Sequence, residues 1–121
     1  MLFFTVSQAQ TAFSHTVSNP TGAILDNSVD TMTYSMQKGY ASVAIQPVIT
    51  RATGTMAGTS VLYNSVNGTN WVATGDTLTN ANQATNTTIW HKTVPARYWR
   101  IITSGATNVT GTTAAKIIIG N

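Results

Sequence analysis

The 121-residue chain carries little charge: 7% of its residues are Asp, Glu, Lys or Arg, against about a quarter in an ordinary globular protein. Its net charge is +3, and its six basic residues are scattered, which argues against nucleic-acid binding. Because it has no cysteine, it has no disulfide, thiolate nucleophile or zinc–thiolate site. The length suits a single domain that folds unaided.

The N-terminal stretch MLFFTVSQAQTAF does not have the pattern of a signal peptide, because its apolar run is too short and no basic residues precede that run. We interpret residues 1–11 as an N-terminal arm or first strand and residues 12–121 as one β-sandwich domain. No segment is long enough to span a membrane, so no membrane association is expected. Apolar anchors for an interface with a partner are predicted at Leu2, Phe3, Phe4 and Phe13.

Short β-patterned runs follow at regular intervals. Residues 13–17 predict an opening strand, and residues 31–37 alternate cleanly, with Met32, Tyr34 and Met36 on one face. Such alternation predicts a strand with one face toward the core.

Residues 41–52 place Val43, Ile45 and Ile49 in one phase, which predicts a further strand with a buried face. Pro47 interrupts this run. Because proline cannot donate a ladder hydrogen bond, we predict that it marks an edge strand or a bulge.

The stretch YNSVNGTNWV predicts a hairpin. Asn67-Gly68 is typical of a two-residue type I′ turn, and the flanking Val61 and Tyr63 are expected to pair with Trp71 across it. Residues 75–87 are polar and too poor in apolar side chains to add a core strand.

The pattern is completed by residues 87–92, 96–104 and 115–120, the last a continuous apolar run suited to a central buried strand. Roughly seven to nine short strands joined by turn residues predict an all-β fold. The arrangement expected is an antiparallel β-sandwich of the jelly-roll type.

Groups able to carry chemistry are few. Asp26, Asn27 and Asp30 place hard oxygen donors in one short stretch, as a calcium site would require, but we interpret them as turn formers. His15 and His91 lie in separate predicted strands, without the spacing of metal ligands or of a catalytic triad. We therefore expect no enzymatic activity, no bound metal and no cofactor.

The tryptophans raise a choice between core and surface. Trp71 and Trp99 lie in β-patterned runs and are predicted to fill the core. Trp90 takes the opposite phase from Ile89, so one of these two must face outward or into an interface. The alternative to a core role is a stacking platform for sugar rings. That ligand-binding platform would consist of Trp90, Tyr98 and Arg97.

Two motifs in the second half of the chain resemble those of discoidin-like, galactose-binding-like jelly rolls. LYNSVNGTNW resembles a Ser-x-Asp-Gly-x-x-Trp hairpin, and ARYWR resembles an Ala-Arg-Tyr-x-Arg strand. The matching residues are Ser65, Asn67, Gly68, Trp71, Ala96, Arg97, Tyr98 and Arg100. Asn67 replaces the usual acid, which keeps the turn. In a domain of this length, the pair is similar to that of small β-sandwich virion proteins of tailed bacteriophages.

We interpret the motif residues as structural, together with Trp99, which lies within the second motif. The structural set is Asn67, Gly68, Trp71, Trp99 and Arg100. Arg100 is expected to reach loop carbonyls or Asp76, whereas Trp99 fills the space between the sheets.

We interpret the protein as a structural virion component, because of the resemblance, the low charge and the small number of side chains that could carry out catalysis or bind a metal. It would be an auxiliary or decoration protein docked on the capsid surface, with the major capsid protein or other virion proteins as partners. A homo-oligomer is expected, and the resemblance implies a trimer. The alternative is a carbohydrate-binding or receptor-binding module, such as a fibre-associated domain, with its ligand on loops 53–59 and 80–86.

Overall fold

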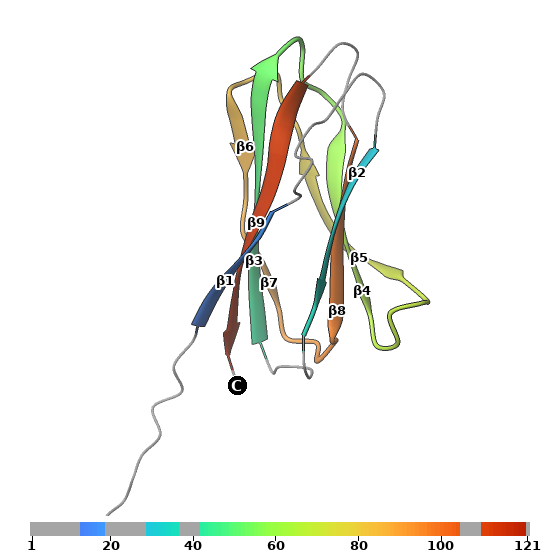
Figure 1. Cartoon of the computed structure of the whole chain (residues 1–121). Coiled ribbons are helices and arrows are strands. Elements are labelled where there is room, and N and C mark those ends of the chain that lie inside the picture. The colour runs from blue at the N-terminus through green and yellow to red at the C-terminus, as the bar shows by residue number, and fades with distance from the viewer. Residues whose placement is uncertain (1–12, 19–28, 37–41, 105–109, 121) are drawn as a thin grey trace, which may run out of the picture.

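The computed structural model describes residues 13–18, 29–36, 42–104 and 110–120 (Figure 1). All regular elements in these ranges are strands, and among them there is no apolar helix of membrane-spanning length. The strands are β1 (Phe13–Ser18), β2 (Val29–Ser35), β3 (Ser42–Thr53), β4 (Thr59–Ser65), β5 (Val72–Thr79), β6 (Thr85–Thr87), β7 (Trp90–Lys92), β8 (Tyr98–Ser104) and β9 (Thr110–Gly120).

The strands form two antiparallel sheets that pack face to face (Figure 1). The five-stranded sheet has the order β1-β9-β3-β6, with β7 also paired to β3, and the four-stranded sheet has the order β2-β8-β4-β5. Because β6 and β7 pair with successive parts of β3, they act as one interrupted strand. Counted in this way, the strands follow the order of a jelly roll, and the predicted β-sandwich is confirmed.

Pro47 on β3 lies beside the interruption between β6 and β7. On one side it pairs with Ala115 of β9. On the other side, β7 pairs up to Ile45 and β6 pairs from Val48 onward. The Thr87 hydroxyl donates to the Pro47 carbonyl at 2.8 Å, so the proline nitrogen faces the gap between β6 and β7. The predicted edge or bulge position was wrong, because β3 is an interior strand whose missing donor falls in that gap.

Inward-facing side chains of both sheets meet between the sheets in a main core cluster and a smaller one of Ile49 and Met56, with Leu78 packed against both. The predicted phase is confirmed on β2, where Met32 is buried and Tyr34 half-buried against the core, and at Met36, which follows β2 and is buried. It is also confirmed on β3, where Val43, Ile45 and Ile49 are buried. Burial of the apolar side chains that alternate along these strands therefore stabilises the sandwich.

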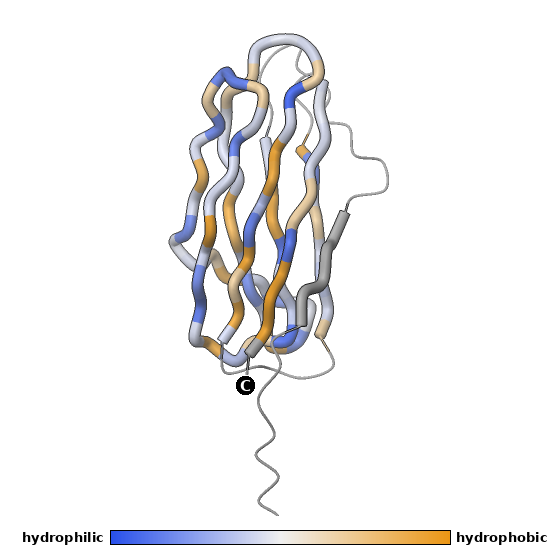
Figure 2. Tube along the Cα trace, turned by 90° about the vertical axis from the view of Figure 1, so that its left-hand side faces the viewer, coloured by the Kyte–Doolittle hydropathy of each residue, from blue (hydrophilic) through white to orange (hydrophobic). Residues whose placement is uncertain are grey.

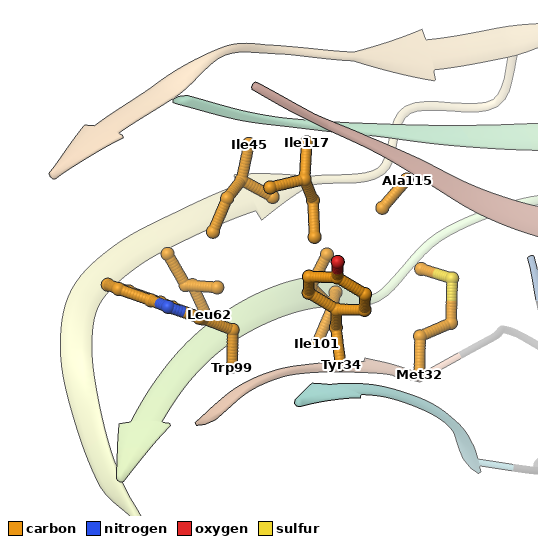
Figure 3. A pocket seen from close by; sticks show the side chains of 8 residues that line it. All are labelled: Met32, Tyr34, Ile45, Leu62, Trp99, Ile101, Ala115 and Ile117. Carbon is orange, nitrogen blue, oxygen red and sulfur yellow. The ribbon is translucent and has the colours of Figure 1, made fainter. Parts of the chain in front are cut away.

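Trp99 is buried in the main core cluster, as predicted, and is 1% exposed. Figure 3 shows it with Leu62, facing Ile45 and Ile117 of the opposite sheet. Its indole Nε1 donates to the Ala96 carbonyl at 3.1 Å. The cavity beside these side chains is about 10 Å³, room for no more than one water molecule, so this cavity is too small for a ligand.

β4 and β5 form the predicted hairpin with a different turn. Residues 66–71 connect them, and Tyr63 lies opposite Ala73, so a two-residue type I′ turn and pairing with Trp71 were wrong. The next predicted loop was also partly wrong, because β5 continues to Thr79 along the sheet edge and β6 adds a short strand.

Candidate functional site

The carboxylates within the described ranges are engaged by neighbouring side chains. Asp76 accepts hydrogen bonds from Lys92 Nζ and Thr74 Oγ1, each at 2.7 Å. Burial raises the pKa of Asp76, but the hydrogen bonds from Lys92 and Thr74 and the charge of Lys92 outweigh burial and hold the pKa below its usual 3.8. Asp30 is buried in the core.

Within the ranges that the structure covers, no group of three or more His, Cys, Asp or Glu is placed to hold a metal ion. His91 is exposed on β7, and the Asp26 and Asn27 of the considered calcium site lie outside the described residues.

Local hydrogen bonds around Ser65 and Asn67 hold the loop between β4 and β5. Ser65 Oγ accepts the backbone N–H groups of Asn67 at 3.2 Å and Gly68 at 2.9 Å, and donates to Asn67 Oδ1 at 3.0 Å. Asn67 Oδ1 also accepts the N–H groups of Thr69 and Asn70, at 2.9 and 2.8 Å. An amide oxygen thus supplies the acceptor that an aspartate would supply, which explains how Asn67 keeps the turn.

The two sequence motifs meet at this loop. Ser65 pairs with Tyr98 across β4 and β8. Gly68 has a φ of 77°, and a Cβ at this position would lie 3.4 Å from the Tyr98 ring. A Cβ there would make only an ordinary contact with the ring, so glycine is required for the left-handed backbone.

Arg100 lies against two aromatic rings. Its guanidinium carbon is 4.4 Å from the ring centroid of Trp71 and 5.2 Å from that of Tyr63. Trp71 is half-buried beside this arginine, so its predicted place in the core was wrong. Arg100 Nε is buried without a hydrogen-bond partner, and Asp76, the expected partner of Arg100, is paired with Lys92 instead.

Arg97 and Tyr98 extend this cluster. The Arg97 guanidinium carbon lies 5.2 Å from the Tyr98 ring centroid. On β8, Tyr98 and Arg100 alternate with the inward-facing Trp99, so these two side chains lie on the outer face of the four-stranded sheet, and Arg97 immediately precedes the strand. We name the following set the aromatic–arginine surface: Tyr63, Trp71, Arg97, Tyr98 and Arg100.

The predicted sugar platform is only partly at the surface. Tyr98 is half-buried and Arg97 is exposed. Trp90 is 6% exposed and packs in the core, so its ring offers no face to a ligand.

The two loops proposed for a ligand pack against each other. Asn82 Oδ1 accepts hydrogen bonds from Arg51 Nη1 at 2.5 Å and from the Met56 N–H at 3.1 Å. The Asn80 N–H donates to the Gly58 carbonyl at 2.9 Å. These bonds occupy polar groups that a ligand between the loops would need.

A second candidate site is an apolar groove on the outer face of the five-stranded sheet, the face seen in Figure 2. Ile89 and Ile118 are 64% and 42% exposed. With Ala44, Gln46 and Lys116 they line a shallow pocket of about 80 Å³. We name these five residues the isoleucine groove.

Half of the isoleucine groove was visible in the sequence. The opposite phases of Ile89 and Trp90 required one of them to face outward, and Ile89 does so. Ile118 was missed because the run from Ile117 to Ile119 is apolar in both phases. The available signal was Lys116, which shares the phase of Ile118 and is exposed.

The predicted N-terminal anchors remain a prediction. Leu2, Phe3 and Phe4 lie outside the described residues. Phe13 opens β1 opposite Ile119, and its side chain is not among those described.

No family model and no curated protein matches the chain. Among solved structures, it is similar to the Yersinia pseudotuberculosis-derived mitogen, with TM-score 0.56 and 10% identity over 93% of this chain and 88% of that one. Infectious bursal disease virus, Gt strain, matches with TM-score 0.49 and 11% identity over 94% of this chain and 32% of that one. The non-crystalline cellulose specific carbohydrate-binding module CBM28 matches with TM-score 0.46 and 12% identity over 96% and 83%. At 10% identity, the likeness to the mitogen shows a shared fold alone.

Proposed function

We propose that this domain is a non-catalytic structural component of a tailed-bacteriophage virion, docked on the capsid through the isoleucine groove. The observation that carries the proposal is the exposure of Ile89 and Ile118 around one groove on a sheet face. Two large apolar side chains placed together in this way supply the buried centre that a protein interface needs.

The charge pattern supports a foreign partner over a second copy of the chain. Lys116 borders the groove, and no described carboxylate lies within salt-bridge distance of it. Within the described ranges, Asp30 is buried and Asp76 is bound to Lys92. A partner surface with an apolar ridge and a nearby carboxylate fits the groove better than the groove of another copy.

The low overall charge and the motif resemblance support the same proposal. With 7% charged residues, the chain has little electrostatic protection against association, which suits a protein covered in part by its neighbours. The N-terminal residues Leu2, Phe3 and Phe4 remain candidates for a further contact with the capsid, and a trimer remains the expected oligomer.

The test is sedimentation of the intact protein with capsids of the phage that encodes it, read by mass spectrometry of the particles. Ile118→Asp should reduce occupancy strongly, since a carboxylate would be buried in the interface. Val66→Asp, at an exposed position in the loop between β4 and β5 of the other sheet, is the control and should keep full occupancy.

A second variant separates the groove from the N-terminal arm. Deletion of residues 1–6 should also reduce occupancy if the arm contributes, while Ile118→Asp reports on the groove alone. Absence of the intact protein from purified particles would refute the virion role. Full occupancy of the Ile118→Asp protein would refute docking through the groove.

A further inference from the structure

We propose that the aromatic–arginine surface binds a saccharide that carries a carboxylate. This second function is independent of docking through the isoleucine groove, which lies on the other sheet. A capsid-bound copy would keep the aromatic–arginine surface directed away from the docked face.

Arg100 has no partner of opposite charge among the described residues. Asp76 is paired with Lys92, and Asp30 is buried on the inward side of β2. Because Arg100 Nε is buried without a partner, the hydrogen bonds still open to the guanidinium are those of its two Nη atoms. A guanidinium partly removed from water gains most from a carboxylate that accepts two parallel hydrogen bonds.

The aromatic rings prepare this arginine for binding. Contacts with Trp71 at 4.4 Å and Tyr63 at 5.2 Å restrict the guanidinium, so less side-chain entropy is lost when a ligand binds. Both rings are half-buried, and their remaining exposed surface can contact the C–H face of a sugar ring.

Exposed hydroxyl groups border the same surface. On β2, Thr33 lies opposite Arg100 and Ser35 lies opposite Tyr98 in the strand register. Both side chains are exposed, and a hydroxyl can donate to and accept from the hydroxyl groups of a saccharide.

A saccharide fits this surface better than an acidic peptide. Extended peptides bind sheets by adding a strand to a free edge. Here β8 and β4 are interior strands whose backbone groups already pair with β2, with each other and with β5. What the surface offers is rings, hydroxyls and one oriented guanidinium, which match a ring-shaped ligand with a carboxylate.

Tryptophan fluorescence of the full-length protein provides the binding test. Trp90 and Trp99 are buried, so the half-buried Trp71 is the tryptophan within reach of a ligand. We expect saturable changes with oligogalacturonate or N-acetylneuraminic acid, weakened by added salt, and none with neutral galacto-oligosaccharides at equal concentration.

Two variants test the role of Arg100. Thr33→Glu places a competing carboxylate beside Arg100 and should weaken binding about tenfold or more, the scale of a hydrogen bond to a charged group. Thr31→Glu, on the same face of β2 but opposite Ile102, is the matched control and should bind as the wild type does. Arg100→Lys, which keeps the charge and loses the planar fork, should weaken binding to a similar extent.

Thermal unfolding of each variant verifies that the sandwich is intact. The proposal is overturned if neither acidic saccharide binds, if neutral saccharides bind equally well, or if the Thr33→Glu protein binds as the wild type does. Saturable binding of poly-glutamate together with inert saccharides would also overturn it. None of these results depends on capsid docking, so failure here and failure of the virion role are separate outcomes.

Discussion

The Thr113 hydroxyl on β9 donates a hydrogen bond to the carboxylate of Asp30 on β2, and both residues are buried. This bond joins an interior strand of one sheet to an edge strand of the other through the core. A buried carboxylate that loses a hydrogen-bond donor still bears the free-energy cost of its removal from water. Loss of this bond is therefore expected to destabilise the fold.

Replacing Thr113 by valine tests this inter-sheet bond. Thr113→Val keeps the shape of the side chain and should lower the free energy of unfolding by about 1.5 to 3 kcal/mol, as for a hydrogen bond to a charged group. Thr113→Ser keeps the hydroxyl and should lose clearly less. Urea unfolding measures both, and equal losses in the two variants would show that the bond contributes nothing.

The contrast between Trp99 and Trp71 tests the core assignment. Trp99→Ala should cost about 3 to 5 kcal/mol, because it opens a cavity between the sheets. Trp71→Ala removes a contact with Arg100 at the surface and should cost about 1 to 2 kcal/mol. Denaturant unfolding of both proteins gives the comparison, and a Trp99→Ala protein as stable as the wild type would contradict the packing described here.

Two glycines with positive φ should differ in their tolerance of alanine. A Cβ on Gly58 would lie 2.2 Å from the Ser104 carbonyl oxygen, so Gly58→Ala forces the backbone to move and should cost more than about 2 kcal/mol. At Gly68 the nearest atoms are 3.4 Å away, and Gly68→Ala should cost about 1 to 2 kcal/mol from the left-handed backbone alone. Melting temperatures should rank the two proteins in this order.

The Asp76–Lys92 pair predicts a pH dependence. The folded-state pKa of Asp76 lies below its unfolded value of 3.8, so the carboxylate stabilises the fold above that pH and loses this effect as the pH falls further. The difference in unfolding free energy between wild type and Asp76→Asn should be constant above about pH 5 and shrink below about pH 4. In a Lys92→Met background the difference should be small at every pH, and an unchanged difference there would assign the effect to another group.

The strands and their buried faces could be predicted because alternation is a local property. The burial of Met32 on β2, and of Val43 and Ile45 on β3, follows from a period of two residues in the sequence. The sheet order could not be read in the same way. Pro47 is an example. Whether β3 can contain a proline at this position depends on where β6 and β7 end, and these strands are distant from it in sequence.

The candidate surfaces depend even more on pairing between distant segments. The resemblance identified the residues of both motifs, but the stacking of Arg100 on Trp71 requires β8 to lie beside β4. Trp71 was assigned to the core because large aromatic residues are usually buried, and the longer loop instead leaves it beside an arginine. Tyr63 was not singled out as a surface residue, since its role follows from being opposite Arg100.

The strand order also constrains how the domain is made. β9 lies between β1 and β3, and β8 lies between β2 and β4, so residues 98–120 supply an interior strand to each sheet. During translation neither sheet can close before this last segment has left the ribosome. Only the β4–β5 hairpin pairs neighbours in sequence among the described strands, and it is the one part able to form early. Folding should therefore be slow and concerted, beginning after synthesis of the domain, as is usual when most contacts have high sequence separation.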